Sequence, residues 1–496
     1  MLDYLVEKGV EQNSMLWPQM HIHLVGIGGS GLSAIAEVLL GRGYDVSGSD
    51  RQLNDRTEAL EAQGAIIFDG HDQYNVGSAD LILVSSAIAD DNPELLAATS
   101  SGIRILKRAE FLGALTAENA TISVAGSHGK TTTTGMIANI MIAADLDPSF
   151  IIGGVLPILG SNGRSGQGKY FVIEADEYDY MFLGLSSKVA VITNVEFDHP
   201  DIFPTPAIYR TAFNQFIDQI QPGGELYICA DDDGVSTLSS ITENSRLNIN
   251  SYGIQSGNWQ AKDLRTNPIG GTDFLVADEG ETIGLARLRV PGEHNVRNGL
   301  AAIAVCLDLG IPFAVVRQAL ADFGGMGRRF EIVGQEGDVV VVDDYAHHPT
   351  EIRVTLAAAR QRFPGRRLWA VWQPHTYSRT KKLQSEFATC FVDADRLVAL
   401  DIFRSRETDT LDIDTPAVLK SVKTPRADYL AGIEDAAFFI LDRIRPGDVV
   451  LTLTAGDGNR VGEIILAELH HRLSKGQSVD RENNLMNPGL DSEETG

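Results

Sequence analysis

The residues with the clearest chemical potential lie between Gly126 and Thr131, where the chain reads Gly-Ser-His-Gly-Lys-Thr. A β-type run, residues 121–124, leads into this stretch, and a helical pattern follows it. In such a turn backbone N–H groups face phosphate oxygens, the lysine reaches the β- and γ-phosphates, and the threonine hydroxyl can bind Mg²⁺. The usual loop has a glycine where this chain has Val124, so the loop is shortened. The stretch predicts a nucleoside-triphosphate site; the competing interpretation is a surface turn that caps an ordinary helix. The predicted contacts are Gly126, Ser127, His128, Gly129, Lys130, Thr131 and Thr132.

A second glycine-rich turn lies near the N-terminus. Gly26-x-Gly28-x-x-Gly31 follows an extended run, and Asp50 lies nineteen residues after Gly31. This spacing matches the dinucleotide fingerprint, in which glycines let a pyrophosphate approach a helix N-terminus and an acidic residue binds a ribose hydroxyl. Three interpretations are open: a nicotinamide cofactor, another diphosphate such as a nucleotide sugar, or a tight turn without a ligand. The triphosphate loop elsewhere in the chain shifts the balance away from redox chemistry.

Acidic and imidazole side chains follow two apolar runs in the middle of the chain. Glu174 ends the run 170–174 and opens Glu-Ala-Asp-Glu-Tyr-Asp, while His199 closes Thr-Asn-Val-Glu-Phe-Asp-His after the run 189–193. The carboxyl ends of parallel strands are where α/β folds place ligand chemistry. Glu174 is a candidate Mg²⁺ ligand because this hard cation prefers oxygen; the alternative is a solvated acidic turn. His199 is a candidate metal ligand, base or capping residue.

Three polar segments occur in the second half of the chain. Asn295 opens a helical pattern, where it either hydrogen-bonds a base edge or caps the helix. Two dense polar loops follow neighbouring strand-like runs. The loop 343–350 combines carboxylate, phenol and imidazole groups, and the loop 373–379 ends in Arg379, which could clamp a carboxylate in a bidentate way. Their position after strands favours a substrate site over ordinary surface.

The secondary structure that must position these side chains can also be predicted from the sequence. Strand-like runs alternate with helical patterns from residue 22 to residue 473, which is typical of an α/β protein with helices on both faces of parallel sheets. We predict a Rossmann-like domain over 1–117, a central P-loop-type ATPase domain over 118–326 and a C-terminal Rossmann-like domain over 327–475. The first twenty residues are expected to form a leader of weak structure, and the polar segment 476–496 a disordered tail.

The composition narrows the partners and the compartment. The net charge is −26 and the pI about 4.8, so the surface should repel nucleic acid and anionic lipid. The three cysteines lie far apart without a CxxC pair, which favours a reducing cytoplasm over a disulfide framework or a zinc site. No apolar run is long enough to cross a membrane, and no secretory signal is visible. We expect a cytoplasmic protein without membrane insertion.

Taken together, the motifs resemble those of the Mur ligases, the ATP-dependent enzymes that build the peptidoglycan stem peptide. The phosphate loop, the Glu-Ala-Asp-Glu block, the Thr-Asn-x-Glu-x-Asp-His block, the His-Asn pair at 294–295 and Arg-Arg-Phe at 328–330 occur in the family's order. The N-terminal Gly-Ile-Gly-Gly-Ser-Gly, the Ser-Ser-Ala-Ile segment at 85–88 and both polar loops of the second half are similar to members that join L-alanine to UDP-N-acetylmuramate. The resemblance covers about residues 20–470.

The resemblance implies a role for each motif. The first domain would bind the uridine diphosphate part of UDP-N-acetylmuramate, the central domain Mg-ATP, and the third domain the amino acid. Lys130 would contact the phosphates. Thr131 and Glu174 would hold one Mg²⁺, and Glu174 with His199 a second. Further ATP contacts would come from Asn295, Arg329 and Asp344. The sugar-nucleotide contacts would be Gly28, Gly29, Ser30, Gly31, Asp50, Ser85 and Ser86. The amino-acid and substrate contacts would be Tyr345, His347, His375 and Arg379. The catalytic residues would be Lys130, Glu174, His199, His347, His375 and Arg379.

The chain also departs from the family pattern, at Tyr178, Phe197 and Thr376. The first two departures are similar to a related ligase that reattaches a recycled L-alanyl-γ-D-glutamyl-diamino-acid tripeptide to UDP-N-acetylmuramate. The loop 374–380 instead favours the alanine-adding members. The tripeptide ligase and, from another class, an NAD(P)-dependent oxidoreductase are the alternatives. The base that takes the proton of the amine is open between the loop holding His347 and His375, and the oligomeric state is open between monomer and homodimer.

Overall fold

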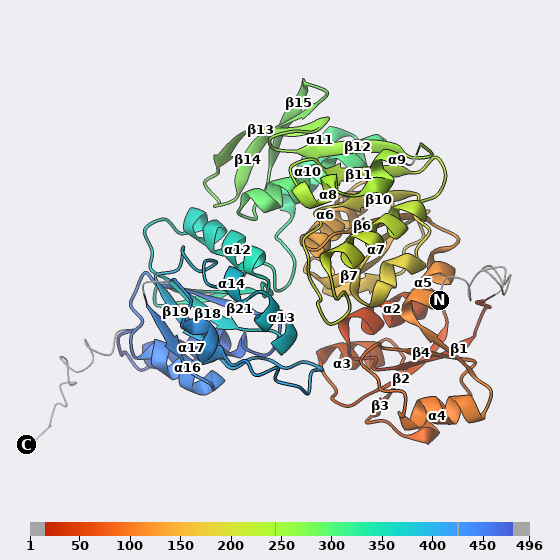
Figure 1. Cartoon of the computed structure of the whole chain (residues 1–496), viewed down its shortest axis with the longest axis horizontal. Coiled ribbons are helices and arrows are strands. Elements are labelled where there is room, and N and C mark those ends of the chain that lie inside the picture. The colour runs from red at the N-terminus through yellow and green to blue at the C-terminus, as the bar shows by residue number, and fades with distance from the viewer. Residues whose placement is uncertain (1–14, 244, 424–425, 480–496) are drawn as a thin grey trace, which may run out of the picture. The chain divides into compact units, whose positions relative to one another are not determined.

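The computed structural model describes residues 15–243, 245–423 and 426–479 (Figure 1). The chain forms two compact units. The first holds nearly all residues up to Gly327, and the second holds Arg328 onwards together with Pro268–Gly271 and Val290–Gly292. Most of the expected leader, residues 1–20, and most of the expected tail, 476–496, lie outside the described residues. The first unit carries two sheets and the second carries one.

The first sheet is fully parallel, and its strands lie in the order β3-β2-β1-β4-β5. The chain order reverses beside β1, so the glycine-rich turn after β1 occupies the switch point where open α/β sheets bind ligands. The strands are β1 (His21–Val25), β2 (Asp45–Asp50), β3 (Ile66–Asp69), β4 (Leu81–Val84) and β5 (Arg104–Lys107). The helices are α2 (Ser30–Gly41), α3 (Asp55–Ala62), α4 (Pro93–Ser100) and α5 (Arg108–Thr116), with a 3₁₀ turn η2 (Gln73–Val76).

The second sheet has ten strands in the order β15-β14-β13-β12-β11-β10-β6-β9-β7-β8. The neighbouring strands β12, β11, β10, β6, β9 and β7 pair in parallel. The pairs β7–β8, β13–β14 and β14–β15 are antiparallel. The antiparallel strands were not predicted, because partly exposed strands such as β15 contain no continuous apolar run. The strands are β6 (Ala120–Ala125), β7 (Ser149–Leu156), β8 (Ser161–Arg164), β9 (Tyr170–Glu174), β10 (Val189–Ile192), β11 (Glu225–Cys229), β12 (Asn248–Gly253), β13 (Trp259–Thr266), β14 (Thr272–Asp278) and β15 (Glu281–Arg287). The helices are α6 (Lys130–Ala143), η3 (Tyr178–Gly184), α7 (Pro206–Asp218), α8 (Asp233–Ser236), α9 (Ser239–Glu243), α10 (Glu293–Asp308) and α11 (Phe313–Asp322).

The two sheets of the first unit are joined by close backbone contacts. The Asn162 side chain on β8 donates a 2.9 Å hydrogen bond to the Ser30 carbonyl at the start of α2. A Cβ on Gly163 would lie 2.2 Å from the Ala34 carbonyl oxygen, so this approach of strand and helix requires glycine. One buried cluster combines side chains from both sheets and from the helices packed on them, including Ile35 of α2 and Ile151 of β7. The glycine-rich turn and the central sheet therefore hold fixed positions relative to each other.

The second unit contains one six-stranded sheet in the order β16-β17-β21-β18-β19-β20, in which only the edge strand β16 is antiparallel. Buried apolar clusters cover both faces, as expected for continuous apolar strands. The strands are β16 (Glu331–Glu336), β17 (Val339–Asp344), β18 (Leu368–Gln373), β19 (Arg396–Ala399), β20 (Ala427–Tyr429) and β21 (Val449–Thr454). The helices are α12 (Pro349–Arg362), α13 (Tyr377–Lys382), α14 (Gln384–Phe387), α15 (Thr415–Leu419), α16 (Ile433–Leu441) and α17 (Arg460–Ser474).

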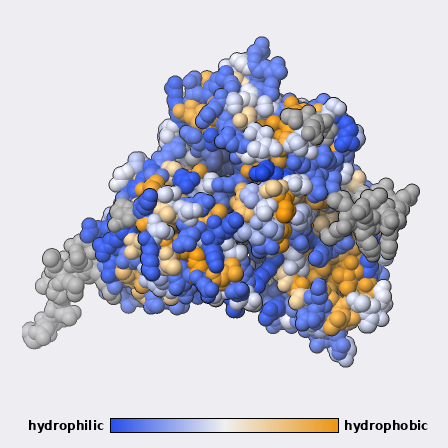
Figure 2. All heavy atoms as spheres, in the orientation of Figure 1, coloured by the Kyte–Doolittle hydropathy of each residue, from blue (hydrophilic) through white to orange (hydrophobic). Residues whose placement is uncertain are grey.

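Within the described residues, none of the helices combines the length and the apolar character that crossing a membrane would require. The face seen in Figure 2 is mostly hydrophilic, with apolar side chains in small scattered patches. The predicted α/β class is confirmed by the three sheets and their helices.

Candidate active site

The predicted phosphate loop links β6 to α6 and depends on two glycines. Gly126 has φ 139° and Gly129 has φ 80°, in the region that favours glycine. A Cβ on Gly126 would lie 2.0 Å from the Thr193 hydroxyl, and one on Gly129 would lie 2.6 Å from the Asn298 side-chain oxygen. Thr193, which follows β10, and Asn298 of helix α10 therefore pack closely against the loop. The Asn194 side chain also accepts a 2.9 Å hydrogen bond from the His128 amide, so the loop is held in one conformation.

Lys130, the first residue of α6, is paired with a buried carboxylate. Its Nζ lies 2.6 Å from Glu177 Oε2 and donates a 2.7 Å hydrogen bond to the Gly126 carbonyl. Glu177 is fully buried, and it also accepts a 3.1 Å hydrogen bond from the Tyr209 hydroxyl. Burial alone would raise the pKa of Glu177, but the positive charge of Lys130 and a hydrogen bond from His199 hold that pKa at about 2. The same partner raises the pKa of Lys130 against the opposing effect of burial, so both groups are charged near neutral pH.

Glu174 lies at the end of β9, beside the first threonine of α6. Its Oε1 accepts a 3.0 Å hydrogen bond from the Thr131 hydroxyl, and its Oε2 accepts a 2.6 Å hydrogen bond from the Gly153 amide. A Cβ on Gly153 would come within 2.8 Å of this carboxylate. A carboxylate and a hydroxyl side by side at the start of α6 are oxygen donors of the type that Mg²⁺ prefers. These two side chains therefore fit a magnesium ion.

His199 lies next to Glu177. Its Nε2 is 3.5 Å from Glu177 Oε1 and 3.7 Å from Asp198 Oδ2, and its ring meets the Tyr178 ring edge-on at 5.0 Å. Non-glycine residues with positive φ concentrate here: His199 (54°), Asp179 (54°) and Tyr180 (57°). Backbone held in this region costs about 1–3 kcal/mol per residue and is typical of functional sites. The acidic block is therefore a strained element next to the phosphate loop.

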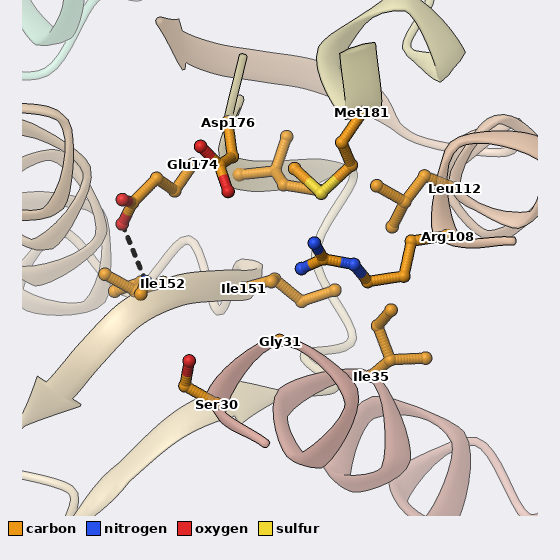
Figure 3. Close-up of a pocket in the computed structure, with 12 residues that line it drawn as sticks. Ser30, Gly31, Ile35, Arg108, Leu112, Ile151, Ile152, Glu174, Asp176 and Met181 are labelled. Atoms are coloured by element: carbon orange, nitrogen blue, oxygen red, sulfur yellow. Dashed lines mark hydrogen bonds between the residues drawn. The ribbon is translucent and has the colours of Figure 1, made fainter. Parts of the chain in front are cut away.

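The first domain meets this cluster in a shared pocket. Ser30 and Gly31 at the start of α2 line one side of the pocket, and Glu174 and Asp176 line another (Figure 3). The pocket encloses about 460 Å³, including its open mouth. Much of the remaining wall is apolar and is formed by Ile35, Leu112, Ile151, Ile152, Ile173 and Met181. The glycine-rich turn and the Glu174 carboxylate therefore line the same pocket.

Asp50 has a local partner in the glycine-rich turn. Asp50 is the last residue of β2, and its Oδ2 accepts a 2.9 Å hydrogen bond from the Gly28 amide. Gly26 has φ 88°, and a Cβ there would lie 3.0 Å from the Ser85 side chain. Asp50 and Ser85 thus both lie against the turn, as the fingerprint requires, and Asp50 also helps to hold the turn in place.

The second unit gathers the other predicted residues at the ends of β17 and β18. Asp344 is buried and accepts hydrogen bonds from the amides of Phe330 (2.8 Å) and Ala346 (2.7 Å). Burial raises the pKa of Asp344 to about 6, although the nearby Arg329 guanidinium opposes this rise. The Arg329 guanidinium also lies 5.1 Å from the centre of the Tyr345 ring. These contacts order the segment that connects the strand end to the arginine pair.

His347, His375 and Arg379 form one cluster in the second unit. The rings of His347 and His375 are 5.4 Å apart, and Arg379, only 3% exposed, places its Nη1 2.9 Å from His375 Nδ1. Since arginine is always a donor, His375 Nδ1 must accept, and the ring proton resides on Nε2. His347 Nδ1 lies 2.8 Å from the Tyr345 carbonyl oxygen and must donate, so a neutral His347 carries its lone pair on Nε2. Thr376, a departure from the family pattern, has φ 66° and caps α13.

Three family models match successive parts of this chain: the Mur ligase family catalytic domain over residues 21–120, the Mur ligase middle domain over 124–306 and the glutamate ligase domain over 328–456. The chain belongs to the Mur ligase family. Similar curated relatives include the UDP-N-acetylmuramate–L-alanine ligases of Acetivibrio thermocellus and a Roseiflexus species. The first is 42% identical over 92% of this chain and 98% of the relative, and the second is 43% identical over 91% and 100%.

Solved structures of Mur ligases agree with this assignment. The UDP-N-acetylmuramate–alanine ligase of Thermotoga maritima is 29% identical and matches with a TM-score of 0.76 over 91% of this chain and 99% of that chain. The murein peptide ligase of Psychrobacter arcticus is 27% identical and matches with a TM-score of 0.69 over 91% and 98%. The fold predicted from the family resemblance is confirmed.

The phosphate loop and the two acidic and histidine motifs come together in the first unit, with one important addition. Lys130, Thr131, Glu174 and His199 lie around the start of α6, but His199 is joined to the group by Glu177, which was not among the predicted site residues. Its position in the quoted Glu-Ala-Asp-Glu block was the available signal. Asn295 lies near the start of α10, is 6% exposed and accepts a 3.2 Å hydrogen bond from the Asn298 side chain.

Proposed function

We propose that this chain is a UDP-N-acetylmuramate–L-alanine ligase of peptidoglycan synthesis, which uses ATP and forms ADP and phosphate. Its relatives at 42–43% identity over nine-tenths of the chain carry this activity in their names. The structural observation that supports it is the shared pocket, which runs from the glycine-rich turn to Glu174. A sugar nucleotide held by its diphosphate at the start of α2 could present a carboxylate beside the phosphate loop.

In the proposed reaction the lactyl carboxylate of the sugar attacks the γ-phosphorus of ATP, ADP leaves, and an acyl phosphate forms. The amine of L-alanine then attacks the acyl carbon, a proton leaves the nitrogen, and the tetrahedral intermediate expels phosphate to give the amide. The first step brings two anions together. Lys130 offsets this repulsion, and bound Mg²⁺, of which we propose two ions, would supply Lewis-acid stabilisation of the phosphoryl oxygens. Thr131 and Glu174 would hold one ion, and Glu174 with His199 the second.

The amine must lose a proton, and the tautomers of the second unit favour His347 over His375. His347 donates through Nδ1 and therefore carries an accepting lone pair on Nε2, whereas His375 accepts from Arg379 and keeps its proton on Nε2. We propose His347 as the base and Arg379, with Tyr345, as part of the amino-acid site.

We also propose the domain limits 1–117, 118–326 and 327–475, with Arg329 and Asp344 as ATP contacts. A cytoplasmic location is proposed from the acidic composition and the three buried free cysteines.

Phosphate release by the purified protein tests the proposal. Mg-ATP and UDP-N-acetylmuramate are supplied with L-alanine, glycine, L-serine or the L-alanyl-γ-D-glutamyl-diamino-acid tripeptide in separate reactions. We expect release that requires the sugar nucleotide and is fastest with L-alanine. Lys130→Ala should abolish release, whereas Lys262→Ala, which removes an exposed lysine on β13, should leave it unchanged. Release with the tripeptide alone would move the chain to the recycling ligases, and release without any sugar nucleotide would refute the ligase proposal.

A further inference from the structure

Arg108 occupies the shared pocket but belongs to none of the motifs. It is the first residue of α5, and Figure 3 shows its side chain reaching from that helix into the pocket beside Gly31. A Cβ on Gly31 would lie 2.2 Å from Arg108 Nη1. The third glycine of the fingerprint therefore makes room for this guanidinium, as well as for the close approach of a ligand.

The guanidinium has no acceptor of its own in the protein. Among the described residues, no hydrogen bond or ion pair involves Arg108, although Glu174 and Asp176 line the same pocket. Neighbouring walls are apolar, including Ile151, Leu112 and Met181 (Figure 3). Arginine stays charged and has five N–H donors in a planar fork that matches carboxylate and phosphate groups. A half-buried fork with apolar neighbours is suited to an oxyanion that a ligand brings.

We propose that Arg108 binds an oxyanion of the sugar nucleotide, either its diphosphate or its lactyl carboxylate. This inference rests on the proposed function, because that function supplies the ligand. The diphosphate is favoured by the contact with Gly31, since the fingerprint directs phosphates to the start of α2. The carboxylate is favoured by the presence of Glu174 in the same pocket, because the carboxylate must reach the phosphate loop. In both cases Arg108 fixes the position of the sugar nucleotide relative to the phosphate loop.

Equilibrium binding of two sugar nucleotides to the full-length protein tests the proposal and separates the two sources. UDP-N-acetylmuramate carries both oxyanions, whereas UDP-N-acetylglucosamine lacks the lactyl carboxylate. Loss of a charge-assisted bidentate contact should raise the dissociation constant about 10- to 100-fold in Arg108→Gln. Arg108→Lys should recover only part of the loss, because an ammonium cannot form the fork. The matched control is Arg104→Gln, which removes an exposed arginine from β5.

The pattern of losses identifies the contact. Weaker binding of both nucleotides assigns Arg108 to the diphosphate, and weaker binding of UDP-N-acetylmuramate alone assigns it to the carboxylate. Unchanged binding of both by a folded Arg108→Gln protein, with a wild-type melting temperature, overturns the inference. If Arg108→Gln unfolds, the Arg108→Lys variant decides, and wild-type affinity in that variant for both nucleotides would also overturn the bidentate contact. If the wild-type protein itself binds neither nucleotide, the proposed function fails instead.

Discussion

Glu177→Gln is the substitution that most directly tests how the phosphate loop is organised. It replaces the buried carboxylate beside Lys130 by a neutral group of the same shape, and the amide oxygen can still accept the hydrogen bond from Tyr209. The pKa of Glu177 falls from 4.5 to about 2 on folding, a shift equivalent to about 3 kcal/mol of interaction. Measured losses for breaking one side of a buried ion pair are about 3–5 kcal/mol. We therefore expect the first unit of the variant to be less stable by about 3 kcal/mol.

Thermal unfolding with and without a non-hydrolysable ATP analogue and Mg²⁺ is the assay. A loss of about 3 kcal/mol corresponds to a fall in melting temperature of about 6–12 °C for a domain of ordinary size. The uncompensated charge of Lys130 should be balanced again by the phosphates, so the fall should be clearly smaller with the analogue bound. The matched control, Glu58→Gln, removes an exposed acid on α3 and should melt like the wild type. An equal fall with and without the analogue would contradict the pairing argument.

The pH dependence of this pair has a defined sign. Glu177 has a lowered pKa in the folded state, so its contribution is present above the unfolded value of 4.5 and is lost as the pH falls through about 2. Lys130 has a raised pKa, so its contribution is present below the unfolded value of 10.5 and is lost only as the pH rises through its higher folded value. Between about pH 5 and pH 10 the stability difference between the wild type and Glu177→Gln should stay constant.

Three further predictions concern other described groups. Glu174→Gln should raise the Mg²⁺ concentration that half-saturates phosphate release at least about 10-fold, and an unchanged Mg²⁺ titration would contradict the role of Glu174. The pKa of Glu94, a buried residue of α4, is lowered to about 2, because the nearby His23 imidazole and hydrogen bonds from Ser49 and Asn75 outweigh its burial. Glu94→Gln should reduce stability at pH 7 by about 3 kcal/mol, and the deficit should disappear as the pH falls from 4.5 through 2. Burial raises the pKa of Asp344 from 3.8 to about 6, so between these values the folded state binds more protons than the unfolded state. The second unit should therefore lose stability as the pH rises from about 4 to about 6. Urea unfolding of the Asp344→Asn variant should lack this loss.

The parts of the site that lie in one short segment could be predicted from the sequence. The phosphate loop was visible because its glycines, lysine and threonine are contiguous and must serve one ligand. The strands β17, β18 and β21 were visible because they are buried on both faces and hence continuously apolar. The pairing of Lys130 with Glu177 could not be predicted, because these residues are 47 positions apart and their spacing carries no periodic signal. Arg108 was missed for the same reason, since only the folded pocket brings it to Gly31.

Lys130 and Glu174 in the first unit are held by internal partners, at positions where ligands are proposed to bind. The Glu177 carboxylate contacts Lys130 at the position proposed for phosphate oxygens. The Thr131 hydroxyl donates a hydrogen bond to Glu174, and both groups are proposed to face a cation when it binds. Such partners stabilise buried charges that would otherwise be costly, and they fix the side-chain geometry before a ligand arrives. Binding then exchanges one charged partner for another, so its net free energy depends on how well the ligand replaces the internal contact. If Lys130 binds ATP phosphates as proposed, Glu177 should therefore influence ATP affinity as well, through the contact that the phosphates must replace.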